Sequence, residues 1–304
     1  HRFAPSPTTC CILFNWDMNV QVTYWPFATA NRLNISAALM HLITAPEKRA
    51  ALRANAPVAW QHDSLAGPEG HSSFWLLNDP YLDDGWNPNS RPQGSAAPPD
   101  TNTTHAPSYT SNLLWALHDA WRQYAYAGDV DALRAVWPVL VGHMNLHLHL
   151  LEKGSDGKLH LPPSWSPEYN EKVPYMGAGD TTYHLALVRW GLERLLEGCE
   201  VLSCTDEGKD AWAGKLSELA DFAVDSHTGA LQVANNLSFS VSHRHFSHLF
   251  PCFPLGLINA SDPRCTNAVD QWYGAAMHGP WTTPSAAGDW CLWSMSVLSS
   301  LSTL

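Results

Sequence analysis

The sequence is short of charge, and the few charges it has are mostly of one sign. Charged residues make up 15% of the 304 residues, against about 25% in an average globular protein. A surface carried by uncharged polar groups suits an extracellular protein. There are 17 Lys+Arg against 28 Asp+Glu, which gives a net charge of −11. This balance argues against binding to nucleic acid, which rests on neutralised phosphates, and against an anionic membrane surface.

Several motifs that would define other functions are also missing. No apolar run approaches the roughly 18 residues of a membrane-spanning helix. No Cys-x-x-Cys occurs, which argues against zinc ribbons and thioredoxin-type redox sites. No His-Glu-x-x-His occurs either, so a zinc peptidase site is not indicated.

Several features that are present predict a secreted protein. Cys199 and Cys204 flank a short polar connection, and Cys252 and Cys265 could close another loop, so both pairs are candidate disulfides. The odd total of seven cysteines leaves at least one thiol unpaired within the chain. Because the chain begins with His1 and shows no signal peptide, its first residue is expected to be a processing boundary.

Asn-x-Ser/Thr triplets add to the secretory signal. None has proline in the middle, so each could accept a glycan, although chance occurrence in a Ser/Thr-rich chain is the alternative. The four sequons are at Asn34, Asn102, Asn236 and Asn259.

Apolar periodicity predicts helices, most clearly between Ser108 and Gly154. Large apolar residues recur there at three- and four-residue steps, the spacing of one helix face. Gly128 is expected to end a first helix and Asp129 to cap a second, in which Pro138 either makes a kink or begins a new helix. A third helix is expected to run from Leu185 to near Gly198. Weaker helical patterns occupy about residues 28–43, 208–224, 264–277 and 288–303.

Long loops separate these helices. Residues 78–107 are rich in proline and read as loop, and a short strand pair is expected around 157–164. No strand–helix alternation is visible, which disfavours a parallel sheet. We therefore expect an all-α fold, a closed ring of helical hairpins whose loops gather into a pocket at one end. No domain boundary is evident, so residues 1–304 are expected to form one domain.

The first segment with candidate chemistry runs from Asn15 to Pro26 and alternates polar with apolar residues. In an extended chain Asp17 and Asn19 would share a face and hold a water between a carboxylate and an amide. The alternative is a capped turn that precedes a helix, since Asp and Asn favour such positions.

The second segment is the proline-bound stretch Pro162–Asn170. Its prolines exclude a helix and predict a stiff loop. Beside Trp165 and Tyr169 the carboxyl of Glu168 would be partly desolvated, which raises its pKa and keeps the proton that a general acid needs. The alternative is an exposed glutamate without a role.

The third segment, His243–Leu249, holds three histidines and an arginine. These side chains suit the hydroxyl groups and developing charge of a sugar. Metal ligands and ordinary structural histidines are the alternatives, and the lack of Cys, Asp or Glu within the motif disfavours the metal. The fourth segment, Trp281–Trp293, places tryptophan platforms around Asp289. Aromatic faces stack on sugars, although most of the 15 tryptophans are expected in the core.

Three of these segments together resemble the family 95 glycoside hydrolases, the inverting 1,2-α-L-fucosidases and their α-L-galactosidase relatives. Trp16–Pro26 is similar to that family's Trp-Asn-x-Asn-x-Gln-x-x-Tyr-Trp-Pro. Ser164–Glu168 resembles its Ser-x-Ser-Pro-Glu, and His243–Leu249 its His-Arg-His-x-Ser-His-Leu. Residues 128–154 look like the helix pair that precedes its acid loop.

The resemblance implies an (α/α)6 toroid with the active site at one end. It implies that Glu168 is the general acid and that Asp17 and Asn19 hold the attacking water, helped by a distal aspartate that Asp289 would match. Whether Asp17 or Asp289 is the base stays open. Contacts with the sugar are expected from Trp16, Trp165, His243, Arg244, His245 and His248.

The sequence departs from the family pattern in three places. Asp17 stands where the family has asparagine, and a carboxylate could itself be the base, whereas an amide only orients the water. The family's His-His-Asn-Thr-Asp-x-Trp segment has no clear counterpart, which bears on the preference for fucose more than on the reaction. The family's β-sandwich is absent as well, so the chain is expected to be a fragment of a longer multidomain chain, with a ring incomplete at its N-terminus.

The sequence thus predicts a secreted glycosidase that removes a terminal α-L-fucosyl or related residue from oligosaccharides or glycoconjugates by single displacement with inversion, without a metal or cofactor. A glycosidase of another specificity on the same toroid, a toroid polysaccharide lyase and an inactive carbohydrate-binding remnant are the alternatives. The sequence does not give the linkage or the oligomeric state.

Overall fold

We describe a computed structural model of the chain over residues 13–15, 19–67, 70–72, 111–164, 166–167, 169, 178–240 and 245–278. This part of the chain is mostly helical, as an all-α fold requires. It divides into two compact units. Unit 1 comprises residues 1–149 and 195–206, and unit 2 comprises residues 150–194 and 207–304.

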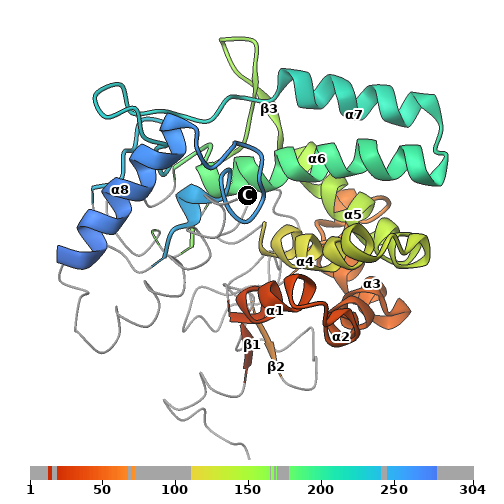
Figure 1. Cartoon of the computed structure of the whole chain (residues 1–304). Helices are drawn as coiled ribbons and strands as arrows, with labels where there is room; N and C mark the ends of the chain where they lie inside the picture. Colours follow the sequence, from red (N-terminus) through yellow and green to blue (C-terminus); the bar gives the residue numbers. More distant parts are fainter. Residues whose placement is uncertain are drawn as a thin grey trace, which may run out of the picture. The chain divides into compact units, whose positions relative to one another are not determined.

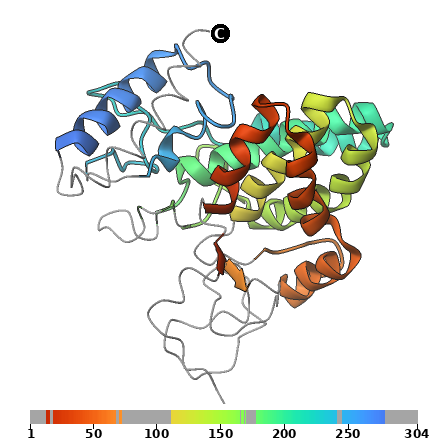
Figure 2. The ribbon, with the colours of Figure 1, turned by 60° about the horizontal axis from the view of Figure 1, so that its bottom comes forward.

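Unit 1 is a group of packed helices with one small strand pair (Figure 1). Helices α1 and α2 contact each other, and both contact α4. Strand β1, which precedes α1 in the chain, pairs antiparallel with β2, which follows α3 and η2 (Figure 2). The elements are β1 (Leu13–Asn15), α1 (Asn19–Thr29), α2 (Leu33–Thr44), α3 (Pro46–Asn55), η2 (Val58–Trp60), β2 (Gly70–Ser72), α4 (Asn112–Ala127) and α5 (Val130–Leu150).

The hairpin of α4 and α5 confirms the clearest prediction from the sequence. Gly128 ends α4 with φ of 67°, a left-handed conformation that favours glycine. The carboxylate of Asp129 then accepts hydrogen bonds from the backbone N–H groups of Asp131 and Ala132, both at 3.0 Å, and so caps α5. Pro138 lies inside α5, which continues through it.

Close backbone approach shapes the core of unit 1 at two glycines. A Cβ on Gly142 of α5 would lie 2.6 Å from Cγ of the fully buried Leu65. The backbone N–H of Leu65 donates to the carbonyl of Gly142 at 2.9 Å, so the segment after η2 rests directly on α5. A Cβ on Gly198 would lie 2.4 Å from the ring of Trp137.

Unit 2 contains a short strand pair, helices and a disulfide. Strands β3 and β4 pair antiparallel around a turn in which Gly157 has φ of 80°. Cys252 and Cys265 are bonded, which joins the segment after η4 to the first turn of α8. The elements are β3 (Glu152–Lys153), β4 (Leu159–His160), most of α6 (Thr182–Leu202) and of α7 (Asp206–Glu218), η4 (Ser247–Leu249) and α8 (Pro263–His278).

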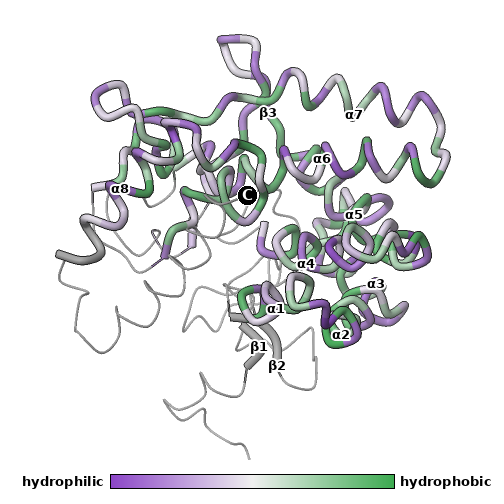
Figure 3. Tube along the Cα trace, viewed as in Figure 1, coloured by the Kyte–Doolittle hydropathy of each residue, from purple (hydrophilic) through white to green (hydrophobic). Residues whose placement is uncertain are grey.

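The predicted helices differ from the structure in three informative ways. The third helix does not end near Gly198, because α6 continues to Leu202 and uses that glycine for contact with Trp137. The sequence pattern also missed α3, which is short and largely hydrophilic (Figure 3). The pattern at 28–43 corresponds to α2, which begins only at Leu33, because the first two residues of that range are the end of α1. The predicted loop at 78–107 and helix at 288–303 lie outside the described residues.

None of the described helices combines the length and the apolar character that crossing a bilayer demands. The expectation of a single domain over residues 1–304 stays a prediction.

Replacing Gly142 by alanine should destabilise the protein. The added methyl meets buried Leu65, and such overpacking costs about 1–3 kcal/mol, more than the gain of about 1 kcal/mol from helix propensity. Gly214→Ala in α7 is the matched control, because nothing lies within 4 Å of its added Cβ. Chemical denaturation should show a loss for Gly142→Ala and a small gain for Gly214→Ala; equal behaviour of the two variants would contradict the close approach.

Unit 2 should lose stability as the pH rises through neutrality. Nδ1 of His160 lies 2.6 Å from Asp180 and Nε2 lies 3.0 Å from Asp156. The hydrogen bond to Asp180, and then that to Asp156, raise the pKa of His160. The charged imidazole therefore stabilises the folded protein fully at a pH below the pKa that His160 has in the unfolded chain. This contribution is lost as the pH rises through the higher pKa of the folded protein.

Unfolding of wild type and of His160→Gln, followed at roughly pH 5.5 and pH 9 on either side of the usual histidine range, checks this expectation. The stability difference between the two proteins should be larger at the lower pH. A difference that does not change with pH would show that His160 is neutral in both states.

Candidate functional site

Most of the residues expected to act on the substrate lie outside the described part of the chain. These are Trp16, Asp17, Trp165, Glu168, His243, Arg244 and Asp289. Residues on both sides of Glu168 and the residues after Arg244 are described, however, and in unit 2 they bring two of the predicted segments together.

Tyr169, the residue after Glu168, anchors the acid loop to the histidine segment. Its side chain is fully buried. The phenol donates a hydrogen bond to the carbonyl of His245 at 2.6 Å and lies 3.0 Å from Nδ1 of His248. Pro167 on the other side of Glu168 is buried as well. The backbone on both sides of the predicted acid is therefore held in place.

A second contact joins the same two segments. The hydroxyls of Ser166 and Ser247 lie 2.6 Å apart and are both buried. The indole N–H of Trp272 in α8 donates to the same His245 carbonyl at 2.8 Å. Two segments about eighty residues apart in the sequence thus form one hydrogen-bonded cluster, which we call the Tyr169 cluster (Ser166, Tyr169, His245, Ser247, His248).

His248 is a neutral member of the Tyr169 cluster. Burial lowers its pKa to about 3, because desolvation penalises the imidazolium. Its ring stacks on Phe239, with ring centroids 5.1 Å apart. Because the Tyr169 proton goes to the His245 carbonyl, the phenol oxygen is left to accept from Nδ1–H of His248. The hydrogen-bond pattern therefore assigns the Nδ1–H tautomer.

The start of the acid loop is fixed by a separate set of bonds. The carboxylate of Asp180 accepts the backbone N–H of Leu161 at 2.7 Å, and the N–H of Asp180 donates to the Leu161 carbonyl. The buried hydroxyl of Ser164 lies 3.0 Å from Nδ1 of His184 in α6. These bonds connect the loop to the first turn of α6, so the loop is supported at its start by a helix and near Glu168 by the Tyr169 cluster.

His245 and His248 were expected to touch the sugar. The exposed fraction is 8% for His245 and 0% for His248. The bonds above engage the imidazole of His248 but only the backbone carbonyl of His245. The alternative of a structural histidine, which the sequence left open, therefore fits the imidazole of His248, and contact of either residue with a sugar stays a prediction.

The first segment is helical rather than extended from Asn19 onward. Asn19 is the first residue of α1, and the consecutive residues Val20, Gln21 and Val22 are all buried. The predicted alternation of faces is therefore wrong for residues 19–22, because α1 packs against α2 and α4 and buries neighbouring positions. The helix agrees with the alternative of a capped turn that precedes a helix, although the turn itself would lie at residues 16–18, outside the described residues.

The two predicted disulfides differ in outcome. Cys252 and Cys265 are bonded, whereas Cys199 and Cys204 are free thiols. The predicted bond between them is therefore not formed in the structure. Burial and the hydrogen bond with Cys199 raise the pKa of Cys204 to about 11, which favours its protonated form.

Three of the predicted glycosylation sites can be placed. Asn34, Asn236 and Asn259 are exposed, and Asn102 lies outside the described residues. Exposure leaves each amide accessible, and glycosylation at all four stays a prediction.

Sequence reasoning missed the residues that support the acid loop. Asp180 and His184 lie outside the segments with candidate chemistry, and nothing in their local pattern indicated that they meet the loop. Ser166, Tyr169 and Ser247 lie within those segments, but only their contacts show what they hold.

Two comparisons with known proteins agree with the resemblance seen in the sequence. The model of the "Glycosyl hydrolase family 95 catalytic domain" matches residues 10–294. A curated protein of Arabidopsis thaliana, "Alpha-L-fucosidase 2", is 28% identical over 189 residues, which are 58% of this chain and 22% of that protein. The chain thus aligns with well under two thirds of this relative. Because the family model covers nearly all of the chain, the chain belongs to glycosyl hydrolase family 95.

Proposed function

We propose that the chain is the catalytic region of a glycosidase that removes a terminal α-L-fucosyl residue, or a related α-L-sugar, with inversion of the anomeric carbon. Family membership and the name of the fucosidase relative support the reaction class. The observation that carries the proposal is the Tyr169 cluster, which fixes the backbone on both sides of Glu168. A general acid must be held within reach of the leaving oxygen.

The proposed reaction is a single displacement. Glu168 protonates the glycosidic oxygen, and a water held by Asp17 and Asn19, with Asp289, attacks the opposite face of the anomeric carbon. Inversion places the two carboxyl groups roughly 6.5–9.5 Å apart, with room for that water. The substrate is an oligosaccharide or glycoconjugate, and the loops of an (α/α)6 toroid form its pocket.

The neutral state of His248 suits this arrangement. A cationic histidine close to Glu168 would lower the pKa of its carboxyl and remove the proton that the reaction needs. Because burial lowers the pKa of His248 to about 3, this histidine is uncharged near neutral pH, and the Tyr169 cluster supports the acid loop without adding a positive charge.

We also propose that the protein works in the secretory pathway or outside the cell. The Cys252–Cys265 bond and the exposed sequon asparagines support this placement.

Replacing Glu168 by glutamine should lower kcat by about 10²–10⁴-fold, because the amide keeps the shape but has no proton to give. The matched control is Glu152→Gln, at an exposed position of β3. The measurement is anomeric proton NMR during hydrolysis of 2′-fucosyllactose, which reports both turnover and stereochemistry.

Wild type should release the inverted anomer, and Glu152→Gln should match it. Retention would contradict the single displacement. If the protein hydrolyses a nitrophenyl glycoside of a different sugar but not 2′-fucosyllactose, its specificity is for that other sugar. If it binds 2′-fucosyllactose without hydrolysing it, the protein is an inactive carbohydrate-binding remnant.

Replacing Tyr169 by phenylalanine should loosen the acid loop. The change removes the acceptor of the buried Nδ1–H of His248, whereas the His245 carbonyl keeps the indole N–H of Trp272 as a donor. Leaving the imidazole N–H unsatisfied costs about 1–3 kcal/mol of stability. We expect kcat to fall several-fold with little change in KM, because Tyr169 positions Glu168 and does not bind the sugar.

Steady-state kinetics over a range of pH on Tyr169→Phe and on Tyr126→Phe, whose side chain is exposed, tests this role. Only Tyr169→Phe should show a lower kcat and a shifted alkaline limb of activity, because activity is lost as the general acid Glu168 loses its proton. If Tyr169→Phe loses stability but keeps the wild-type pH profile, Tyr169 stabilises the fold and does not position Glu168.

A further inference from the structure

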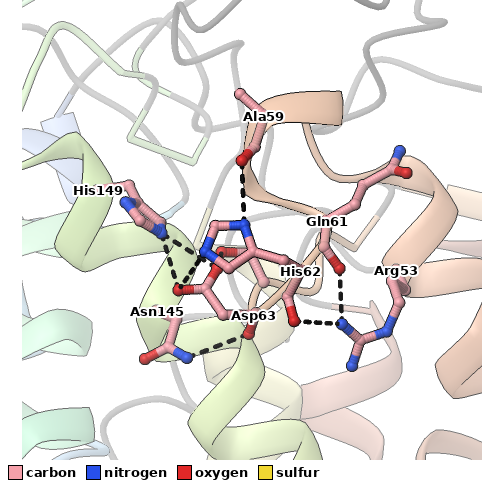
Figure 4. Close-up of polar contacts among 8 residues, drawn as sticks. Arg53, Ala59, Gln61, His62, Asp63, Asn145 and His149 are labelled. Carbon is pink, nitrogen blue, oxygen red and sulfur yellow. Dashed lines mark hydrogen bonds and ion pairs between the residues drawn. The ribbon is translucent and has the colours of Figure 1, made fainter.

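Two histidines and an aspartate converge at one place on unit 1 (Figure 4). His62 and Asp63 follow η2, and His149 lies in the last turn of α5. Nε2 of His149 lies 3.0 Å from Oδ2 of Asp63, and Nε2 of His62 lies 3.6 Å from the same oxygen. One ligand atom from each of the three residues lies within 4.8 Å of the others.

The ring of His62 is oriented with a nitrogen lone pair toward this point. Its Nδ1 lies 3.1 Å from the carbonyl of Ala59, which can only accept, so Nδ1 carries the proton. Nε2 then has the lone pair, and it is the nitrogen that faces Asp63. A backbone carbonyl that fixes the tautomer of a histidine in this way is the usual second partner of a metal-binding imidazole.

The other two side chains are held as well. The ring of His149 stacks on Trp60, with centroids 5.0 Å apart and planes inclined by 12°. The hydroxyl of Ser64 donates to Oδ1 of Asp63 at 2.8 Å, while Oδ2 is the oxygen nearest to His62. Although partial burial opposes ionisation, the hydrogen bonds from Ser64 and His149 lower the pKa of Asp63. The carboxylate is therefore charged at neutral pH.

The backbone of the turn is fixed from both sides (Figure 4). The guanidinium of Arg53 in α3 donates to the carbonyls of Gln61, at 2.6 Å, and His62, at 3.2 Å. The amide of Asn145 in α5 donates to the carbonyl of Asp63 at 3.1 Å. The three side chains are thus presented by a rigid turn and a rigid helix.

The nitrogen–oxygen distances are close to those around a tetrahedral metal. Ligand atoms that are each about 2.0–2.1 Å from zinc lie about 3.3 Å from one another. The observed nitrogen–oxygen distances of 3.0 and 3.6 Å lie on either side of this value, and the ligand atoms of the two imidazoles lie within 4.8 Å of each other, so side-chain rotation about a metal would complete the geometry.

We propose that His62, Asp63 and His149 bind a divalent transition-metal ion, zinc foremost, that fastens the turn after η2 to the C-terminal end of α5. Two imidazoles and one carboxylate suit zinc rather than magnesium or calcium, which prefer oxygen ligands throughout. Three protein ligands leave a fourth position for water. The site goes beyond the proposed glycosidase function and requires none of its residues.

Binding depends on pH in a defined direction. Each histidine must present an unprotonated nitrogen to the metal, and His149 must release the Nε2 proton that now faces Asp63. Affinity should therefore fall as the pH drops, because protons compete with the metal for these nitrogens.

Titration of Zn²⁺ into the protein against a competing chromophoric chelator tests the proposal. Wild type should bind one equivalent that is weakened at least about tenfold in His62→Ala, Asp63→Asn and His149→Ala, since even outer partners of such sites contribute that much. His41→Ala is the control, because it changes an exposed histidine on α2 of the same unit, and it should bind as wild type does. Equal zinc affinity in all of these proteins would overturn the proposal.

Replacement of zinc by Co²⁺ separates this site from the free thiols Cys199 and Cys204. Bound cobalt should show visible d–d absorption without the near-ultraviolet charge-transfer band of thiolate ligation, and the absorption should be lost in His149→Ala. Zn²⁺ should also raise the midpoint of thermal unfolding of wild type and of His41→Ala, but not of His62→Ala, because a ligand that binds the folded state stabilises it. A thiolate band that survives in His149→Ala, or an equal thermal shift in every variant, would assign the metal to other residues and overturn the site.

Discussion

The hydrogen bond from the Tyr169 phenol to the His245 carbonyl is the constraint on which the candidate site of unit 2 depends. Tyr169 is fully buried, and losing its hydroxyl would remove one of two donors to that carbonyl and leave the Nδ1–H of His248 without its acceptor. The same phenol oxygen accepts a hydrogen bond from His248, and the hydrogen bond between Ser166 and Ser247 joins the same two segments a second time. A loop with three prolines has few backbone donors of its own, so its conformation is fixed chiefly by such side-chain bonds.

Unit 1 is held by a different kind of interaction. Its centre is the close packing of α5 against the segment that follows η2, which the missing side chain of Gly142 permits. His143 and Asn145 of α5 then bond the carbonyls of Leu65 and Asp63 in that segment. The proposed metal ligands belong to the same two segments, so the packing of α5 against the segment after η2 also brings His62 and Asp63 close to His149.

Local signals predicted the helices well where the pattern and the end signals agreed. The α4–α5 hairpin has periodic apolar residues, a glycine in the left-handed region and an aspartate cap, and each of these acts within a few residues of the chain. The same reasoning failed at Gly198, because a glycine can serve a close contact as well as a helix end. It failed at α3, whose hydrophilic sequence carries little periodic signal.

The sequence by itself determined the helical class, the family and the segments that carry candidate chemistry, because composition, periodicity and motif order are properties of the chain alone. Only the tertiary structure decided which side chains meet. The bonds of Tyr169 with His245, of Ser166 with Ser247 and of His149 with Asp63 span 76, 81 and 86 residues. Contacts at such separations depend on how helices pack in three dimensions, and no local pattern in the sequence encodes them.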